Sequence, residues 1–352
     1  MRRPALIALI LTLASCGAPN GLKDESRANS CGSVQGISIL GPFTHENLSV
    51  FLLEKRESPR DGQDYVILEQ ALKEGTLRVM EKPQGAQVNL LELENTGERP
   101  VYIQAGDTVK GGQQDRTIAV DFVVPPKSGR MPISAFCVEP GRWSSRGGAV
   151  QYQTVDLPRA TTNQFGGVEF TLSEVPAATR EQKLAIRLEK SQSQVWAAGG
   201  LVTGRTIAGQ PLSSSYVLAT EAPEIKNRIA EYVESLKGVV NREESLIGMA
   251  FLVNGELDTI DVYGNSNLFQ KLWPKLLRGA ALEAMMKKSN AASGKPTFSG
   301  EVLRFLEPAA QGERRVENLP GGIRITVFNG SEAASFDTER DGVLLHRQVI
   351  AK

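Results

Sequence analysis

A glycine-rich polar segment lies between two apolar stretches of the sequence. It reads Gly106-Asp107-Thr108-Val109-Lys110-Gly111-Gly112-Gln113-Gln114-Asp115-Arg116 and combines hydrogen-bond donors, acceptors and charges. Glycines let a backbone approach a bound molecule closely, and loops held by strands often carry functional residues. The segment is therefore a candidate ligand-binding loop. The alternative is a solvated connection whose glycines only permit the turn.

A second polar segment follows, Cys137-Val138-Glu139-Pro140-Gly141-Arg142-Trp143. A glutamate beside an arginine and a tryptophan can hold a polar ligand against an aromatic face. The same residues can instead form a salt bridge that closes a turn over Trp143. Both interpretations stay open on the sequence alone.

The familiar catalytic motifs are missing, which narrows the chemistry. No Gly-Lys-Ser/Thr ending follows Gly106, so the loop is not a phosphate-binding Walker motif, and there is no Gly-x-Ser-x-Gly elbow. The histidines are His45 and His346, which excludes a histidine-rich zinc site and leaves two bases for a serine or cysteine nucleophile. We expect neither metal nor cofactor, and carboxylate chemistry remains open.

The N-terminus has the pattern of a bacterial lipoprotein signal. Arg2 and Arg3 precede an apolar run at 5–13, and Leu13-Ala14-Ser15-Cys16 follows, which is the layout of a cleaved export signal. The run is too short for a membrane span of about 20 residues; a buried N-terminal strand or helix is the alternative. We expect cleavage after residue 15 and lipidation of Cys16, whose acyl chains would anchor the protein in a bilayer.

Localisation and partners follow from this signal. Gly17 follows the cysteine where aspartate would favour the inner membrane, so we expect the outer membrane in a host with two membranes. Cleavage would leave 337 of the 352 residues, and loss of Arg2 and Arg3 from a balance of 40 basic and 40 acidic residues leaves a net charge of −2. Because the basic residues are also scattered, we expect no nucleic-acid partner. An envelope protein or a small ligand remains.

Two cysteines remain beyond Cys16. Cys31 lies in the polar segment 18–36, which is typical of a tether, and Cys137 lies in an apolar strand-like run. An oxidising envelope compartment would allow them to pair. A buried free thiol at Cys137 is the alternative.

The pattern along the chain predicts an α+β fold. Residues 37–160 are β-rich, with strands expected at 48–54, 77–81, 88–94, 101–104, 117–124 and 133–138 and one helix at 67–74 ended by Gly75. Residues 161–245 form a helical connection. A capping box at Thr179 begins a helix to Trp196, and a second helix is expected at 223–237, with Pro223 near its start and Gly238 near its end.

Residues 246–352 combine strands and helix. Asn254-Gly255 predicts a tight hairpin, and Ser266 caps a long helix that Pro274 should kink or divide in two. Asn329-Gly330 and Asp341-Gly342 predict turns of a C-terminal antiparallel meander. Residues 16–36 are the expected tether, and 37–352 could form one integrated domain.

Ordered motifs resemble the ARG and Rhodanese-Phosphatase-superfamily-associated protein family. They are Gly106-Asp107-x-Val109-x-Gly111-x-x-Gln114-Asp115-Arg116, Val124-Pro125-Pro126 and Cys137-Val138-Glu139-x-Gly141-Arg142-Trp143. The segment Leu268-Phe269-x-Lys271-Leu272-Trp273-Pro274-Lys275-Leu276-Leu277-Arg278 is similar to that family's long helix after a hairpin. The resemblance spans about residues 37–290.

The resemblance implies a domain of unknown function that is associated with ADP-ribosylglycohydrolases and phosphatase-like proteins. If the family is enzymatic, the matching positions to test are Gln114, Asp115, Arg116, Glu139 and Arg142. Asp115 or Glu139 would then be an acid or base, the arginines would bind anions, and Cys137 would be a nucleophile. The lipid anchor departs from this picture, because nucleotide-linked chemistry is expected in the cytosol.

Two functional hypotheses follow. The first is an envelope lipoprotein without catalytic activity that binds another component or contributes to assembly. The second is a ligand-binding or hydrolytic enzyme that uses the glycine-rich loop and the segment from Cys137 to Trp143. Geometry separates them: a site requires Asp115, Arg116, Glu139 and Arg142 to meet in a concave pocket.

Overall fold

The computed structural model describes most of the chain beyond residue 32. The described residues are 33–34, 36–55, 62–81, 89–111, 114–140, 170–171, 176–204, 206–207, 210–211, 215–240, 245–288, 299–306 and 312–352. No helix in these ranges is long and apolar enough to cross a membrane.

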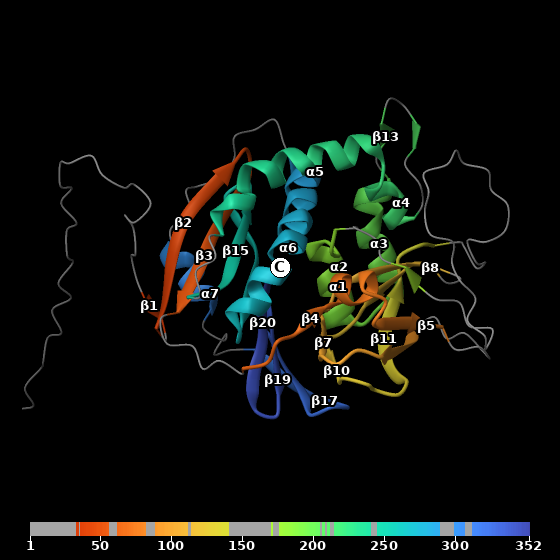
Figure 1. Cartoon of the computed structure of the whole chain (residues 1–352). Coiled ribbons are helices and arrows are strands. Elements are labelled where there is room, and N and C mark those ends of the chain that lie inside the picture. The colour runs from red at the N-terminus through yellow and green to blue at the C-terminus, as the bar shows by residue number, and fades with distance from the viewer. Residues whose placement is uncertain are drawn as a thin grey trace, which may run out of the picture.

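A nine-stranded antiparallel sheet forms one layer of the molecule (Figure 1). Its strands, in spatial order, are β1 (Ser33–Val34), β2 (Ile37–His45), β3 (Leu48–Lys55), β15 (Leu246–Val253), β16 (Glu256–Tyr263), β20 (Val343–Ala351), β19 (Ala333–Arg340), β18 (Ile323–Asn329) and β17 (Glu313–Leu319). Strands from the first 55 residues therefore share a sheet with strands from the last 110 or so. The predicted α+β class and the C-terminal antiparallel meander are confirmed.

The predicted hairpin at Asn254-Gly255 joins the two central strands. Both turn residues have positive φ, 55° and 79°, as a type I′ turn needs. Every residue of β15 is buried, because both faces of this part of the sheet are covered. Helix α7 (Ser299–Leu306) packs on one face through Val302, Leu303 and Leu306, and helix α6 (Ser266–Lys287) packs on the other through a larger apolar cluster.

Helix α6 corrects one expectation. Pro274 lies inside a single continuous helix, so a division into two helices is wrong, and the side chain that caps it is Asn265 rather than Ser266. Leu272, Leu276 and Leu277 are buried on both sides of the proline. Their packing holds the helix together where one backbone hydrogen bond is lost. Helix α5 (Pro223–Leu236), which begins at the predicted proline, crosses α6 (Figure 1).

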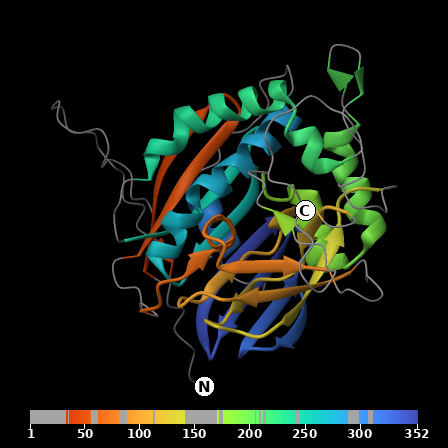
Figure 2. The same ribbon diagram turned by 45° about the vertical axis from the view of Figure 1, so that its right-hand side comes forward.

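Smaller sheets form the second layer. A six-stranded sheet has the order β12 (Phe170–Thr171), β8 (Thr108–Gly111), β9 (Arg116–Ile118), β11 (Met131–Cys137), β6 (Leu90–Asn95) and β5 (Leu77–Met80). A three-stranded sheet has the order β10 (Phe122–Val124), β7 (Val101–Ile103) and β4 (Val66–Ile67), and β4 leads into α1 (Leu68–Lys73). β13 (Thr206–Ile207) and β14 (Gln210–Pro211) form a separate pair. Figures 1 and 2 show the C-terminal meander, in blue, next to the strands of the six- and three-stranded sheets.

The single strand expected at 117–124 is wrong. The chain leaves β9 after Ile118 and starts β10 at Phe122. In between, the Asp121 carboxylate accepts a hydrogen bond of 2.8 Å from the backbone N–H of Ala105. The interruption between the two strands therefore places the buried Asp121 carboxylate where a continuous strand would have formed further backbone hydrogen bonds.

The helix expected from Thr179 to Trp196 is also divided. Its capping box is confirmed and begins α2 (Arg180–Leu184), which continues as a π-helix, η1 (Ala185–Glu189). Lys190 then adopts a left-handed conformation with φ 52°, and Ser191 caps α3 (Gln192–Thr203). A short α4 (Tyr216–Thr220) and a 3-10 turn, η2 (Lys237–Val239), complete the helices. π-helical turns often occur at functional sites, and η1 faces the space between the layers.

Candidate functional site

Four of the predicted site residues meet in the protein interior. Gln114, Asp115, Arg116 and Glu139 are each at most 5% exposed. The Gln114 amide donates to the Glu139 carbonyl at 3.1 Å, and Arg116 donates to the Gln114 side-chain oxygen at 3.2 Å. These predicted residues are therefore in contact with one another, but they do not line the cleft described below.

Their contacts join secondary-structure elements. Asp115 accepts from the Gly111 N–H at 3.0 Å and from the Ser215 hydroxyl at 3.1 Å, which links the β8–β9 turn to α4. Arg116 reaches Glu81 after β5 at 3.2 Å. From the same loop, Asp107 forms an ion pair with Lys275 of α6. These bonds satisfy buried charges and fix neighbouring elements.

Cys137 is buried and forms no disulfide with any residue that the structure describes. Its sulfur donates to the Glu139 carbonyl at 3.3 Å, and burial raises the pKa of the thiol. A thiol with a raised pKa is a poor nucleophile at neutral pH. Cys16, Cys31, Arg142 and Trp143 lie outside the described residues, so lipidation, pairing with Cys31 and the roles of Arg142 and Trp143 stay predictions.

A buried charge network joins the two layers and was not found from the sequence. His346 of β20 lies between two aspartates, with Nδ1 3.1 Å from Asp121 Oδ2 and Nε2 2.9 Å from Asp261 Oδ1. Arg187 of η1 contacts the same Asp121 oxygen at 3.0 Å and Gln348 at 2.9 Å. Two cations and two carboxylates balance one another in the interior.

The network favours the charged forms of Asp121, Asp261 and His346. Burial alone would raise the pKa of Asp121, but Arg187 and His346 outweigh it and hold that pKa far below its usual range. Burial opposes protonation of His346, yet Asp121 and Asp261 raise its pKa. With a carboxylate at each nitrogen, both nitrogens of His346 donate. The ring therefore offers no lone pair to accept a proton as a general base.

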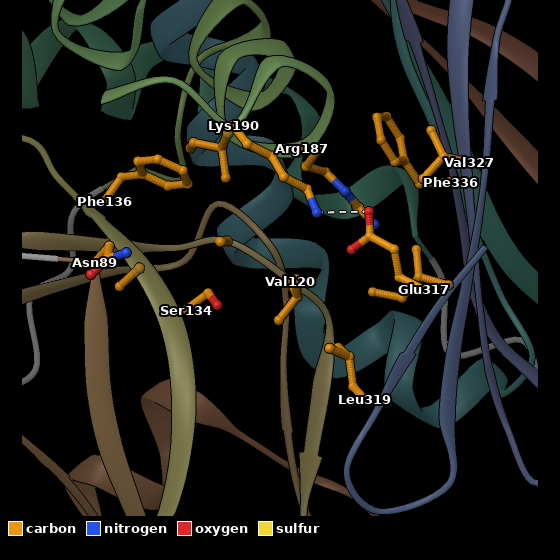
Figure 3. Close-up of a pocket in the computed structure, with 14 residues that line it drawn as sticks. Asn89, Val120, Ser134, Phe136, Arg187, Lys190, Glu317, Leu319, Val327 and Phe336 are labelled. Atoms are coloured by element: carbon orange, nitrogen blue, oxygen red, sulfur yellow. Dashed lines mark hydrogen bonds and ion pairs between the residues drawn. The ribbon is translucent and has the colours of Figure 1, made fainter. Parts of the chain in front are cut away.

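A cleft of about 380 Å³ opens beside this network (Figure 3). One wall comes from β11 and the 119–121 connection, the other from the C-terminal meander, and η1 with Lys190 forms the roof. The apolar residues on its walls are Ala119, Val120, Ala135, Phe136, Ile186, Leu319, Ile325, Val327 and Phe336. The polar ones are Asn89, Ser134, Arg187, Lys190 and Glu317. Apolar walls with a few polar groups are typical of small-molecule sites.

Arg187 connects the cleft to the network. Its guanidinium lies 4.3 Å from the centroid of the Phe336 ring on one wall, while its N–H groups hold Asp121 behind the other. The π-helical turn that carries Arg187 therefore spans both layers. The walls of the cleft are fixed by a buried ion pair as well as by packing.

A second buried group of charges lies where α2, β16 and α6 meet. Glu283 pairs with Lys287 at 2.6 Å and accepts from the Arg180 N–H at 3.2 Å; Lys287 is 3.5 Å and Arg180 3.8 Å from Asp258. Burial, then Asp258 and Glu181, raise the pKa of Glu283 to about 7, although Lys287 opposes this. Burial also raises the pKa of Asp258. Within the described ranges, no three His, Cys, Asp or Glu side chains are arranged to hold a metal ion.

The fold and site define the class of protein: an α+β protein in which an antiparallel sheet and smaller sheets enclose an interior charge network beside an open cleft. The chain belongs to the ARG and Rhodanese-Phosphatase-superfamily-associated Protein domain family, whose model matches residues 36–350. No curated protein and no solved structure matches the chain.

His346→Gln tests the network. Because the pKa of His346 is raised above the usual value of about 6.5, its stabilising charge is complete below about pH 6.5 and is lost as the pH rises through the higher folded value. We expect a loss of about 3 kcal/mol in the free energy of unfolding near pH 6 and a smaller loss near pH 9. Urea unfolding at both pH values measures this. A loss that grows with pH would contradict the assignment.

Glu283→Gln tests the second group of charges. The folded pKa of Glu283, about 7, lies above its usual 4.5, so ionisation of the buried acid costs stability as the pH rises between these values. The free energy of unfolding of the wild type should fall relative to the variant over this window. Asp258→Asn should give a difference of the same sign, because burial raises that pKa too. If the free energy of unfolding has the same pH dependence in the wild type and in both variants, the raised pKa values of these two acids are refuted.

Proposed function

We propose that this protein is a lipid-anchored binding protein of the bacterial cell envelope and that the cleft beside Arg187 is its ligand site. The observation that carries the proposal is the cleft itself, about 380 Å³ with mainly apolar walls. This volume lies within the range of about 300–1,000 Å³ that small-molecule sites occupy.

The protonation and burial of the candidate nucleophiles and bases favour binding over hydrolysis. Both ring nitrogens of His346 bind carboxylates. The other histidine, His45, packs its ring against Tyr232. The buried Cys137 thiol has a raised pKa. Asp115 and Glu139 are engaged by backbone donors, at 3.0 and 3.4 Å. Each of these groups serves the fold in the described part of the chain.

The anchor rests on the sequence. The family match begins at residue 36, so the signal pattern ending at Cys16 and the polar tether lie ahead of the matched domain. A lipid on Cys16 would hold the cleft within a tether's length of the membrane. A binding protein for an envelope component is consistent with that position.

Metabolic labelling with palmitate tests the anchor. The wild-type full chain should incorporate label in bacterial cells, Cys16→Ala should incorporate none, and Cys31→Ala should label as strongly as the wild type. Equal labelling of Cys16→Ala and wild type would exclude Cys16 as the lipidated residue. Loss of label from Cys31→Ala alone would place the lipid elsewhere.

Ligand screening with a blocked cleft tests the site. Ser134 is an exposed residue on the cleft wall, so Ser134→Trp should fill the cleft at little cost to folding. We expect compounds that raise the melting temperature of the full chain, from a set of nucleotides, ADP-ribose, sugars and octyl amphiphiles, to lose at least tenfold in affinity for this variant.

Ser193→Trp is the matched control, because it adds the same side chain at an exposed position on α3 that does not line the cleft. Its affinities should equal those of the wild type. Compounds that bind Ser134→Trp with the same affinity as the wild type would show that the ligand site is not this cleft. Absence of any shift across the set would contradict the proposed binding function.

A further inference from the structure

Lys190 and Glu317 line one edge of the cleft and form an ion pair with each other. Lys190 Nζ lies 2.7 Å from Glu317 Oε1, and Arg315 Nε lies 3.0 Å from the same oxygen. Figure 3 shows the Lys190–Glu317 contact crossing between the roof and the meander wall. Two cations thus share one carboxylate at this opening.

The interior end of the cleft adds no net charge. Arg187 is paired with Asp121, and the second aspartate of the network is balanced by His346. Arg187 is almost completely buried, whereas the Lys190 side chain is 48% exposed. Lys190 is therefore the cation that a molecule entering the cleft meets first.

Lys190 can exchange partners without leaving Glu317 unpaired. Arg315 remains on the Glu317 carboxylate at 3.0 Å when Lys190 moves away. The cost of the exchange is small, because ion pairs between solvent-exposed side chains contribute little to stability. The Lys190 backbone is held by the left-handed turn that ends η1, so its ammonium group stays within reach of the cleft mouth.

We propose that the cleft, taken as the site of the proposed function, selects an amphipathic molecule with one negative charge. An aliphatic or aromatic body lies between the Val120 and Phe136 wall and the Leu319 and Val327 wall. The anionic group binds Lys190 in place of Glu317, and Asn89 or Ser134 accepts or donates a hydrogen bond at the opposite rim. Charge complementarity at the mouth supplies the selectivity.

Three octyl probes that differ only in the charge of their head group test this. Octanoate, 1-octanol and octylammonium are titrated at neutral pH into the full chain with labelled valine and leucine methyl groups, and NMR shifts of Val120, Leu319 and Val327 report on the cleft. Octanoate should bind about tenfold more tightly than 1-octanol, and octylammonium should bind most weakly. Equal affinities for the three would overturn the charge selectivity and leave the binding site in place, whereas no shift with any probe would contradict both.

Variants at the mouth of the cleft distinguish a direct contact of Lys190 with the ligand from a general effect of net charge. Lys190→Gln should weaken octanoate binding about threefold to tenfold and leave 1-octanol unchanged. Glu317→Gln should strengthen octanoate binding, because the competing carboxylate is gone. Arg324→Gln on neighbouring β18 removes the same charge outside the cleft and should change neither. An equal loss of octanoate binding in Arg324→Gln and Lys190→Gln would refute the role of Lys190.

Discussion

The arrangement of this protein depends on the burial of one carboxylate, Asp121, between two layers of β-sheet. A buried charge without partners is very costly, and Asp121 receives its partners from three distant segments: Ala105, Arg187, and Thr338 with His346. Arg187, Thr338 and His346 lie on η1, β19 and β20, and Ala105 lies in the connection between β7 and β8. Separating or sliding the layers would expose the Asp121 charge or leave it without partners. This carboxylate therefore helps to fix their relative position, together with bonds such as that from Gln104 to Asp261.

Several irregular features of the chain are consequences of this requirement. The strand ladder is interrupted between β9 and β10, which lets Asp121 turn inward. The helix after Thr179 widens into a π-helical turn that carries Arg187. β20 places His346 and Gln348 on the same inward face. Local departures from regular structure at functional or strained positions are expected where global and local preferences conflict.

Local patterns in the sequence were enough to predict the elements but not the contacts between them. The hairpin at Asn254-Gly255, the capping box at Thr179, the proline start of α5 and the meander are confirmed, because turn chemistry and apolar periodicity are short-range signals. The burial of Gln114, Asp115, Arg116 and Glu139 was not visible, and neither was the pairing of Asp121, His346 and Asp261. Those partners are 85 and 225 residues apart, and no spacing rule links them. An acid inside an apolar run, Asp121 between Val120 and Phe122, was the one signal available.

The buried network also explains why a cleft can persist in an otherwise closely packed interior. Apolar cavities tend to collapse unless their walls are held apart, and here one wall belongs to β11 and the other to the meander. Arg187 touches both: it stacks over Phe336 and bonds to Asp121. Because the same residue balances the interior charge and supports the roof, the cleft is preorganised, and a ligand would bind without the cost of ordering its walls. The exposed Lys190 at the mouth can then select the ligand by its charge. Its change of ion-pair partner does not disturb the buried contacts that stabilise the fold.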